Sequence, residues 1–243
     1  MTADLRKLWQ EAFGDSVDTL DAFFGTAFSP DRHHCIWEKG IPVSALYWFD
    51  CTLEDSKLAY IYAVATLQSH RGKGLAHKLM KETHEILKSK DYAGAILVPG
   101  TKALFSFYEK IGYRTATAIT EFSCVSGDAA AKIVPISHTE YARLRKNYLP
   151  AGGVIQEGET LRFLEAQGQF YKGEDFLLAG GVDGDTFLAQ ELLGNTQTAP
   201  AILRSLNIPE GRFRTPGEGK PFAMYLPLRE NTPKPAYFGL ALD

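Results

Sequence analysis

Apolar residues recur at intervals of three and four along several stretches of the first half of the chain, which is the pattern of an amphipathic helix. Gly14 follows the first stretch and Ser16 precedes the second, and these residue types favour the end and the start of a helix. In the third stretch His77 and His84 fall on the polar side, so both are expected to be solvated rather than to bind a metal. Helices are predicted over residues 4–13, 16–27 and 75–87, and from residue 101 onward.

Strands are predicted where apolar residues run together, or alternate with polar ones, between turn-forming residues. Lys39-Gly40 lies between two such runs, and we expect it to form the turn of a hairpin. Strands that alternate with helices in this way predict the α/β class with a mixed sheet. The strands are expected over residues 35–38, 41–50, 58–67, 95–98 and 113–125.

The second half of the chain repeats this order of elements. Residues 137–140, Ser-His-Thr-Glu, form a capping box that predicts a helix start, and Asp183-Gly184 predicts a hairpin turn. Residues 126–131 are expected to form a linker, so we expect two domains, over residues 1–126 and 127–243. The predicted elements are helices over 138–148, 160–167 and 199–206 and strands over 176–180, 186–193, 222–226 and 236–242.

Composition limits the classes of partner. The 243 residues carry a net charge of −3 and no basic run, whereas binding a nucleic-acid backbone needs a concentrated basic face. No apolar stretch reaches the roughly 18 residues that span a bilayer, and no secretory leader is apparent. Cys35, Cys51 and Cys124 are widely spaced, as expected of reduced thiols. We therefore expect a cytoplasmic protein with no metal, no nucleic-acid partner and no membrane partner.

A glycine-rich turn over residues 69–74 stands between a predicted strand and a predicted helix. The first N–H groups of a helix have no intrahelical partners, and the helix dipole adds partial positive charge there. Gly72 and Gly74 let the main chain approach an anion closely, so a phosphate or pyrophosphate is the expected ligand. The turn is not a P-loop, and it is not a dinucleotide fingerprint, whose third glycine would replace His77.

A second motif lies downstream, over residues 101–113. It carries Ala103, Tyr108 and Gly112-Tyr113 at the spacing of a motif in the GCN5-related N-acetyltransferase (GNAT) family, and residues 69–74 match the family's pyrophosphate motif Q/R-x-x-G-x-G/A. In this order and spacing, the two motifs together resemble that family over roughly the first half of the chain. Ser69 departs from the pattern, because the family usually has glutamine or arginine there.

The resemblance implies the GNAT fold in a tandem form, whose second domain is a degenerate copy without a glycine turn. It implies acetyl coenzyme A (acetyl-CoA) as co-substrate, one per chain. In the family, the strand before the turn ends in a bulge and splays from its neighbour, so that its main chain binds the pantetheine arm. Tyr108 is implied as the catalytic acid at the departing thiolate. The cofactor-binding residues implied are Val64, Ala65, Thr66, Arg71, Gly72, Lys73, Gly74, Leu75 and Ala76.

The activity implied is an acyltransferase that moves an acetyl group to a primary amine of a small molecule or peptide, by direct attack in a ternary complex. No general base stands out, and Glu121, His34 and Asp243 remain candidates. An acyl-enzyme route through Cys124 or Cys51 has no supporting pattern nearby. Two alternatives to an enzyme stay open: a non-catalytic acyl-CoA-binding or sensing protein with the same fold, and a structural interaction module. A homodimer is compatible with each of them.

Overall fold

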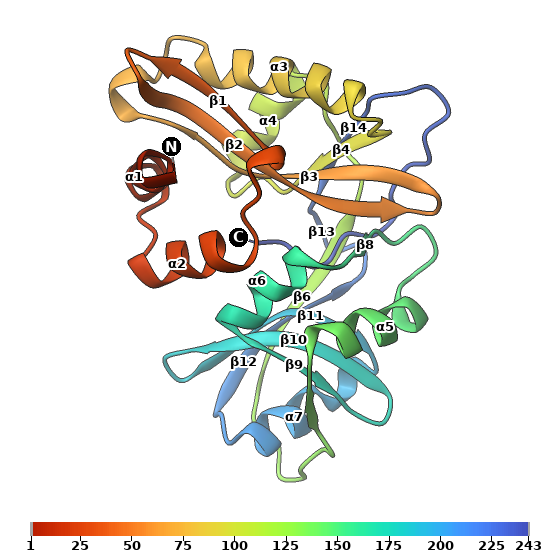
Figure 1. The fold of residues 1–243 in the computed structure, drawn as a ribbon. Helices are drawn as coiled ribbons and strands as arrows, with labels where there is room; N and C mark the ends of the chain where they lie inside the picture. Colours follow the sequence, from red (N-terminus) through yellow and green to blue (C-terminus); the bar gives the residue numbers. More distant parts are fainter. Residues whose placement is uncertain (1, 243) are drawn as a thin grey trace. The chain divides into compact units, whose positions relative to one another are not determined.

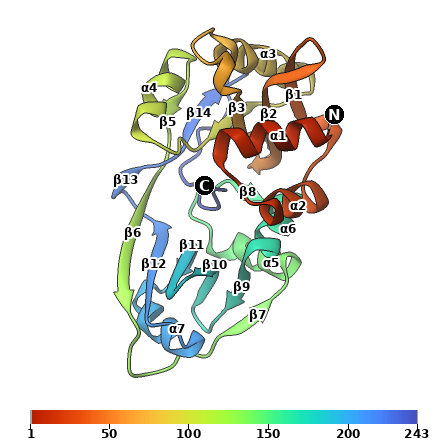
Figure 2. The same ribbon diagram turned by 90° about the vertical axis from the view of Figure 1, so that its left-hand side faces the viewer.

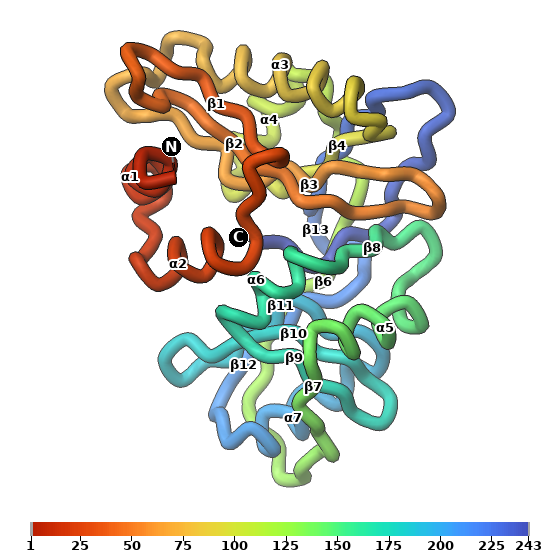
Figure 3. Tube along the Cα trace, in the orientation of Figure 1, coloured from red at the N-terminus to blue at the C-terminus, as the bar shows by residue number. Residues whose placement is uncertain are grey.

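The computed structural model describes residues 2–242, which form two compact units (Figure 1). The first unit contains residues 2–115 and Met224–Lys234, and the second contains Ala116–Ala223 and residues 235–242. The chain therefore passes between the units more than once, as the colours of Figure 3 trace. This differs from the single boundary expected near residue 127, because strand pairing between distant segments, and not sequence order, defines the units.

The sheet of the first unit has the strand order β1-β2-β3-β4-β14-β5. The strands β1, β2 and β3 form an antiparallel meander, β4 runs parallel to β3, and β14 is antiparallel to both β4 and β5. Since β14 comes from the C-terminal part of the chain, the strand predicted over 222–226 completes the first unit. The strands are β1 His33–Glu38, β2 Ile41–Leu53, β3 Ser56–Thr66, β4 Gly94–Leu97, β5 Arg114–Thr115 and β14 Met224–Pro227.

Helices cover both faces of this sheet. Successive side chains of a strand point to opposite faces, so along β2 Trp48 joins the core cluster that contains Leu79 of α3, while Tyr47 and Phe49 pack against Phe23 of α2. The four helices confirm those predicted from periodicity. They are α1 Thr2–Phe13, α2 Val17–Thr26, α3 Leu75–Ser89 and α4 Lys102–Lys110.

The long strand predicted over 113–125 is divided between the two sheets. Its first residues form β5 in the first unit, and the remainder forms β6, Ala118–Val125, in the second. Between them, the N–H groups of Ala116 and Thr117 both donate to the carbonyl of Ala223 (2.9 and 3.3 Å). The prediction of one strand was wrong. The residue types over 113–125 favour extended structure throughout, but they do not determine which sheet each part joins.

The second unit repeats part of this topology. Its strand order is β13-β6-β12-β11-β10-β9-β7, in which β9, β10 and β11 are antiparallel and β12 runs parallel to β11 after α7. Figure 2 shows this sheet with α7 against one face and α5 against the other. The elements are β6, β7 Val134–Ile136, α5 His138–Tyr148, β8 Ile155–Gln156, α6 Glu159–Gln167, β9 Gln169–Lys172, β10 Phe176–Asp183, β11 Thr186–Gly194, α7 Ala199–Leu206, β12 Glu210–Pro216 and β13 Lys220–Pro221.

Two predictions for the second half were wrong, and five strands were missed: β7, β8, β9, β12 and β13. Residues 236–242 form no strand, although Tyr237, Phe238, Leu240 and Ala241 are all buried. The expected linker over 126–131 is fastened to α7 by main-chain hydrogen bonds to Pro200 and Ala201. Among the missed strands, β12 does alternate between buried and exposed residues, so the period of two could have identified it.

A buried ion pair crosses the core of the second unit. Arg145 of α5 donates through Nε and Nη2 to the carboxylate of Glu191 on β11, at 2.6 and 2.8 Å, and both side chains are almost fully buried. The hydroxyls of Tyr141 and Tyr237 also donate to this carboxylate, at 2.7 and 2.9 Å. Glu191 thereby joins α5, β11 and the C-terminal segment.

Two further features of the described chain bear on the expectations above. Between residues 2 and 242, no helix combines the length and the apolar character needed to cross a bilayer. In the same range, no group of three or more histidine, cysteine, aspartate or glutamate side chains is arranged to hold a metal ion.

His84 is buried, contrary to its expected solvated position on α3. Its side chain is 6% exposed, and its Nε2 lies 3.0 Å from the hydroxyl of Tyr113. Burial, helped by the nearby charge of Lys88, lowers the pKa of the imidazole to about 4. The buried side of α3 is thus wider than its apolar residues alone indicate, because polar groups can be buried when they find a partner.

The buried histidine predicts acid sensitivity of the native state. An unfolded histidine binds its proton near pH 6.5, whereas native His84 binds it only near pH 4. Between these values the unfolded state holds more protons, so stability falls as pH falls, by roughly 2 kcal/mol at pH 4.5. Urea unfolding at pH 7 and pH 4.5 measures the loss, and His84→Gln should remove this part of it. An identical loss in both proteins would contradict the assignment.

Candidate active site

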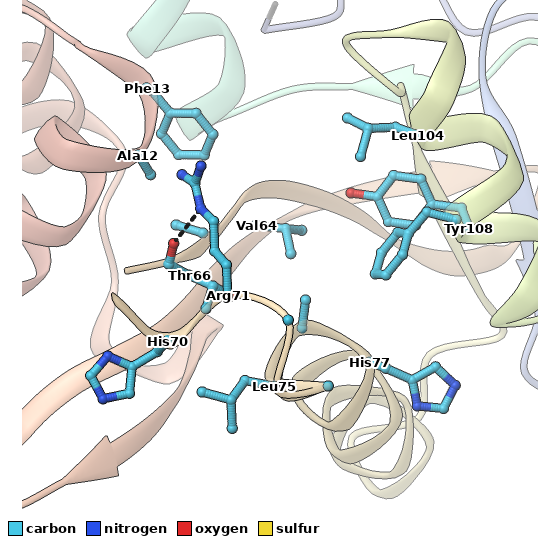
Figure 4. A pocket seen from close by; sticks show the side chains of 15 residues that line it. Ala12, Phe13, Val64, Thr66, His70, Arg71, Leu75, His77, Leu104 and Tyr108 are labelled. Carbon is cyan, nitrogen blue, oxygen red and sulfur yellow. Dashed lines mark hydrogen bonds between the residues drawn. The ribbon is translucent and has the colours of Figure 1, made fainter. Parts of the chain in front are cut away.

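A cavity of about 430 Å³ lies in the first unit where β3 ends, α3 begins and α4 passes by (Figure 4). All of its lining residues belong to this unit, and they come from α1, β3, the turn after β3, α3 and α4. Most of the lining side chains are apolar. Polar contacts to a ligand would therefore come largely from the main chain.

The glycine turn brings the start of α3 to the cavity. Gly72 and Gly74 have φ angles of 77° and 76°, a left-handed conformation that is costly for other residues. Gly74 is the N-cap of α3, and no described side chain caps the helix there. The next three residues, Leu75, Ala76 and His77, line the cavity, and their N–H groups have no intrahelical acceptors. This geometry suits an anion.

β3 carries a β-bulge close to the cavity. Its register against β2 shifts between Tyr62 and Ala65. Two residues of β3 there oppose one residue of β2, and the first of them, Ala63, has a φ of 52°. Trp9 of α1 donates its indole N–H to the Ala63 carbonyl (3.0 Å). The bulge is thus held from α1, and its presence confirms the expectation for this strand.

β3 also separates from its neighbour β4 at the cavity. The parallel pairing of these strands ends where Tyr60 lies opposite Ile96, although β3 continues to Thr66. The edge of β3 over residues 61–66 therefore has no partner in β4. Its main-chain groups on that side take no part in a ladder with β4, and those other than the carbonyls of Ala63 and Thr66, which accept from Trp9 and Arg71, can bind a ligand.

Tyr108 lies on α4, and its hydroxyl is directed into the cavity (Figure 4). The side chain is 7% exposed, and burial raises the pKa of its phenol to about 12. A phenol with this pKa is protonated at neutral pH and can donate a hydrogen bond or a proton. The rings of Phe107 and Tyr113 pack against it at centroid distances of 5.1 and 5.8 Å.

The cavity brings together nearly all of the residues singled out in the sequence. Lys73 is the exception, because it is exposed and does not line the cavity. The predicted residues at the cavity are Val64, Ala65, Thr66, Arg71, Gly72, Gly74, Leu75, Ala76 and Tyr108.

Several lining residues were missed, because most of them carry no motif. Leu104 could have been found, since it lies four residues before Tyr108 and so on the same face of the helix. Ala12 and Phe13 come from the distant helix α1, which nothing in the local sequence assigns to this place. The missed residues are Ala12, Phe13, His70, His77, Leu104 and Phe107.

Polar contacts hold the glycine turn against its surroundings. Arg71 donates its Nε–H to the Thr66 carbonyl (3.2 Å), as the dashed line in Figure 4 marks. The N–H of Gln68 donates to the Glu11 carboxylate of α1 (2.8 Å). Ser69, the residue that departs from the family motif, lies with its Oγ 2.8 Å from Nδ1 of His70. These contacts connect the turn and the residue before it to the end of β3 and to α1.

None of the candidate bases that the structure describes lines the cavity. Glu121 belongs to the second unit, where it pairs with Lys220 at 2.5 Å. His34 lies 3.0 Å from the carboxylate of Glu82 on the surface of α3. Asp243 lies outside the described residues. No base is therefore assigned.

Comparison with known proteins agrees with this geometry. Residues 2–116 match the family model described as acetyltransferase (GNAT) domain, and nearly all of these residues fall in the first unit. A search of curated protein sequences finds no match to the chain.

Solved structures with the same fold extend over nearly the whole chain. A GCN5-related N-acetyltransferase from Kribbella flavida aligns with a TM-score of 0.68 at 16% identity, over 93% of this chain and 69% of its own. A second GCN5-related N-acetyltransferase, from Anabaena variabilis, aligns with a TM-score of 0.68 at 14% identity, over 94% of this chain and 71% of its own. Eis1 from Mycobacterium abscessus aligns with a TM-score of 0.66 at 11% identity, over 93% of this chain and 71% of its own. The chain therefore has the GNAT fold, and its residues 2–116 match the model of a GNAT acetyltransferase domain.

Proposed function

We propose that the protein is an acetyl-CoA-dependent N-acetyltransferase whose acceptor is a primary amine of a small molecule or a peptide. The observation that carries this proposal is a single cavity bordered by the uncapped N-terminus of α3, the splayed edge of β3 and the hydroxyl of Tyr108. These three features match the diphosphate, the amide-containing pantetheine arm and the sulfur of the co-substrate, in that order along the molecule.

The residues of the turn fit a diphosphate. A Cβ added at Gly72 or Gly74 would meet no atom within 4 Å, so the space above the turn is open. The uncapped N–H groups of Leu75 and Ala76 would donate to the phosphate oxygens, and Arg71 would add positive charge at the rim. The edge of β3 over residues 61–66 would pair with the pantetheine amides, as an added strand would.

The chemistry assigned to the chain is positioning and proton donation. Acetyl-CoA supplies a thioester whose carbonyl carbon an amine attacks directly. A main-chain N–H at the β3 bulge would hold the carbonyl oxygen as negative charge develops on it. The cavity would hold both reactants together, and such positioning lowers the entropic part of the barrier. Tyr108 would donate its phenolic proton to the departing thiolate.

We also propose that the second unit is a degenerate copy of the first. Support comes from topology, because β9-β10-β11-α7-β12 follows the order and strand directions of β1-β2-β3-α3-β4. The copy would bind no co-substrate. In the segment that joins the end of β11 to α7, residues 194–198, the only glycine is Gly194, where an added Cβ would lie 2.2 Å from the carbonyl of Asp175, so this turn is closed. One molecule of acetyl-CoA per chain follows.

Release of free thiol from acetyl-CoA with a panel of amines tests the proposal. An N-acetyltransferase releases coenzyme A only with a suitable amine, and acetyl-CoA also raises its melting temperature, because a ligand of the native state stabilises it. Binding without release across the panel would identify a sensing protein. No shift in melting temperature with acetyl-CoA would indicate a structural module and would contradict the proposal.

Substitution of the N-cap glycine should weaken binding of the co-substrate. In Gly74→Ala the φ of 76° is strained by roughly 1–2 kcal/mol, and the added methyl group enters the open space above the turn. We expect the dissociation constant of coenzyme A to rise about tenfold or more, equivalent to about 1.4 kcal/mol. Isothermal titration calorimetry measures this change.

Gly40 offers a matched control for this substitution. It lies in the turn between β1 and β2 with a φ of 78°, and a Cβ added there also meets no atom within 4 Å. Gly40→Ala should therefore carry the same backbone strain and lower the melting temperature similarly. Because Gly40 does not line the cavity, the Gly40→Ala variant should bind coenzyme A with unchanged affinity. Equal affinity in both variants would argue against a cradle at Gly74.

A further inference from the structure

A buried pair of polar side chains lies behind Tyr108 and has no part in the chemistry described above. His84 of α3 is 6% exposed and Tyr113 is fully buried. Nε2 of His84 and the hydroxyl of Tyr113 are 3.0 Å apart, and their rings lie 5.5 Å apart between centroids. Burying two polar groups is unfavourable unless they bond to each other. Each therefore depends on the other for a hydrogen-bond partner.

Tyr113 is in direct contact with Tyr108. The two rings pack edge to face, with centroids 5.8 Å apart and planes at 67°. The main-chain N–H of Tyr113 also donates to the carbonyl of Tyr108 (3.1 Å). Movement of the Tyr113 ring would therefore displace the Tyr108 ring, since packed side chains leave little space for independent motion.

The hydroxyl of Tyr108 makes no hydrogen bond to any of residues 2–242. The hydroxyl is therefore available to a ligand. Its position in the cavity is set by the packing of the Tyr108 ring alone. Phe107 packs on the same ring at 5.1 Å. Of these two aromatic neighbours, Tyr113 is the one fixed by a hydrogen bond of its own side chain.

We propose that His84 and Tyr113 are positioning residues for Tyr108. The His84–Tyr113 hydrogen bond fixes the Tyr113 ring, and that ring fixes the direction in which the Tyr108 hydroxyl enters the cavity. The inference rests on the proposed function, in which Tyr108 donates a proton to the leaving sulfur. A small error in the position of such a group reduces the rate strongly, because proton transfer needs close alignment.

The state of His84 supports a constant role across the working pH range. Burial lowers the pKa of its imidazole to about 4, so the ring is neutral near pH 7. The charged and titratable groups near it are Lys88 and Glu85 on its own helix, and Tyr113. A neutral imidazole can either accept from or donate to the tyrosine hydroxyl, according to its tautomer. In both cases the bond persists.

Tyr113→Phe tests the inference with the smallest change, since only the hydroxyl is removed. We expect kcat to fall about 3- to 10-fold, with no change in KM for acetyl-CoA or in the dissociation constant of coenzyme A. His84→Leu should act in the same direction, and His84→Gln, which keeps a hydrogen-bonding group, should recover part of the loss. A change in KM with kcat unaltered would overturn the inference.

A double-mutant cycle separates positioning from a general structural role. If the pair acts through the Tyr108 hydroxyl, Tyr113→Phe should have no further effect on kcat once Tyr108→Phe is present. Additive losses would overturn the inference and leave the proposed function intact. If Tyr108→Phe alone leaves kcat unchanged, both the acid role of Tyr108 and this inference fail.

A spectroscopic measurement gives a readout that does not depend on turnover. With ring-labelled tyrosine, the Tyr108 signal is identified by its loss in Tyr108→Phe. It should shift in Tyr113→Phe and in His84→Leu. Tyr92→Phe is the matched control, because Tyr92 is equally buried in the same core and its hydroxyl accepts from Trp48 at 2.9 Å. A Tyr108 signal unmoved in Tyr113→Phe, or moved as much in the control, would overturn the inference.

Discussion

Tyr108→Phe is expected to lower kcat about 10²- to 10⁴-fold, the range that general acid catalysis supplies. The phenylalanine ring keeps the packing with Phe107 and Tyr113 and removes only the O–H that faces the cavity. Binding of the diphosphate and pantetheine portions does not involve this group, so KM for acetyl-CoA should stay within about twofold. Steady-state kinetics with a responsive amine measures both constants. A loss confined to KM would contradict the role of acid.

The pH profile provides a second test of the same role. An acid must be protonated to act, so activity is lost as pH rises through its pKa. Burial raises the pKa of Tyr108 to about 12, above the usual value for tyrosine of about 10. We therefore expect no alkaline loss from this group below about pH 10. A descending limb near pH 8 that disappears in Tyr108→Phe would contradict the raised pKa, and one that persists would report another group.

Glu191→Ala is expected to destabilise the second unit by about 3–5 kcal/mol, the usual result of breaking a buried ion pair from one side. The substitution leaves the guanidinium of Arg145 buried without its countercharge, and the hydroxyls of Tyr141 and Tyr237 lose their acceptor. Chemical denaturation followed by circular dichroism measures the change. Glu191→Gln keeps the shape and some hydrogen bonds and should cost less.

A surface pair on the same helix provides the control. Arg143 and Glu140 of α5 form hydrogen bonds of 3.0 and 2.9 Å, but the Arg143 side chain is 65% exposed. Water and salt screen such pairs, so Arg143→Ala should destabilise the protein far less than Glu191→Ala does. If Glu191→Ala were as mild as Arg143→Ala, the buried network would not hold the second unit together.

The elements whose pattern is local were predicted well. The helix over 75–87 and the helix after the capping box at Ser137 appear as α3 and α5, because periodicity and caps act within a few residues. The glycine turn was predicted for the same reason, since its geometry depends on glycines that adopt positive φ. The motif around Tyr108 placed a phenol on a helix, and the structure places it at the cavity.

Features that depend on distant segments were not predictable in this way. β14, which follows residue 223, belongs to the first sheet, whereas β6, which follows β5 in the chain, belongs to the second. Strand residues report a preference for extended structure but not the identity of the partner strand. His84 looked solvated on the helical pattern alone, because its partner Tyr113 lies 29 residues away.

By itself, the sequence determined the local geometry of this protein: a strand, a glycine turn and a helix start that can bind an anion, followed by a helix that carries Tyr108. Steric limits on φ and the period of a helix act between near neighbours, so the residues specify these features directly. The tertiary structure alone decided which strands share a sheet, that α1 supplies a wall of the cavity, and that His84 is buried against Tyr113. Those outcomes depend on the free energy of packing the whole unit, which no short stretch contains.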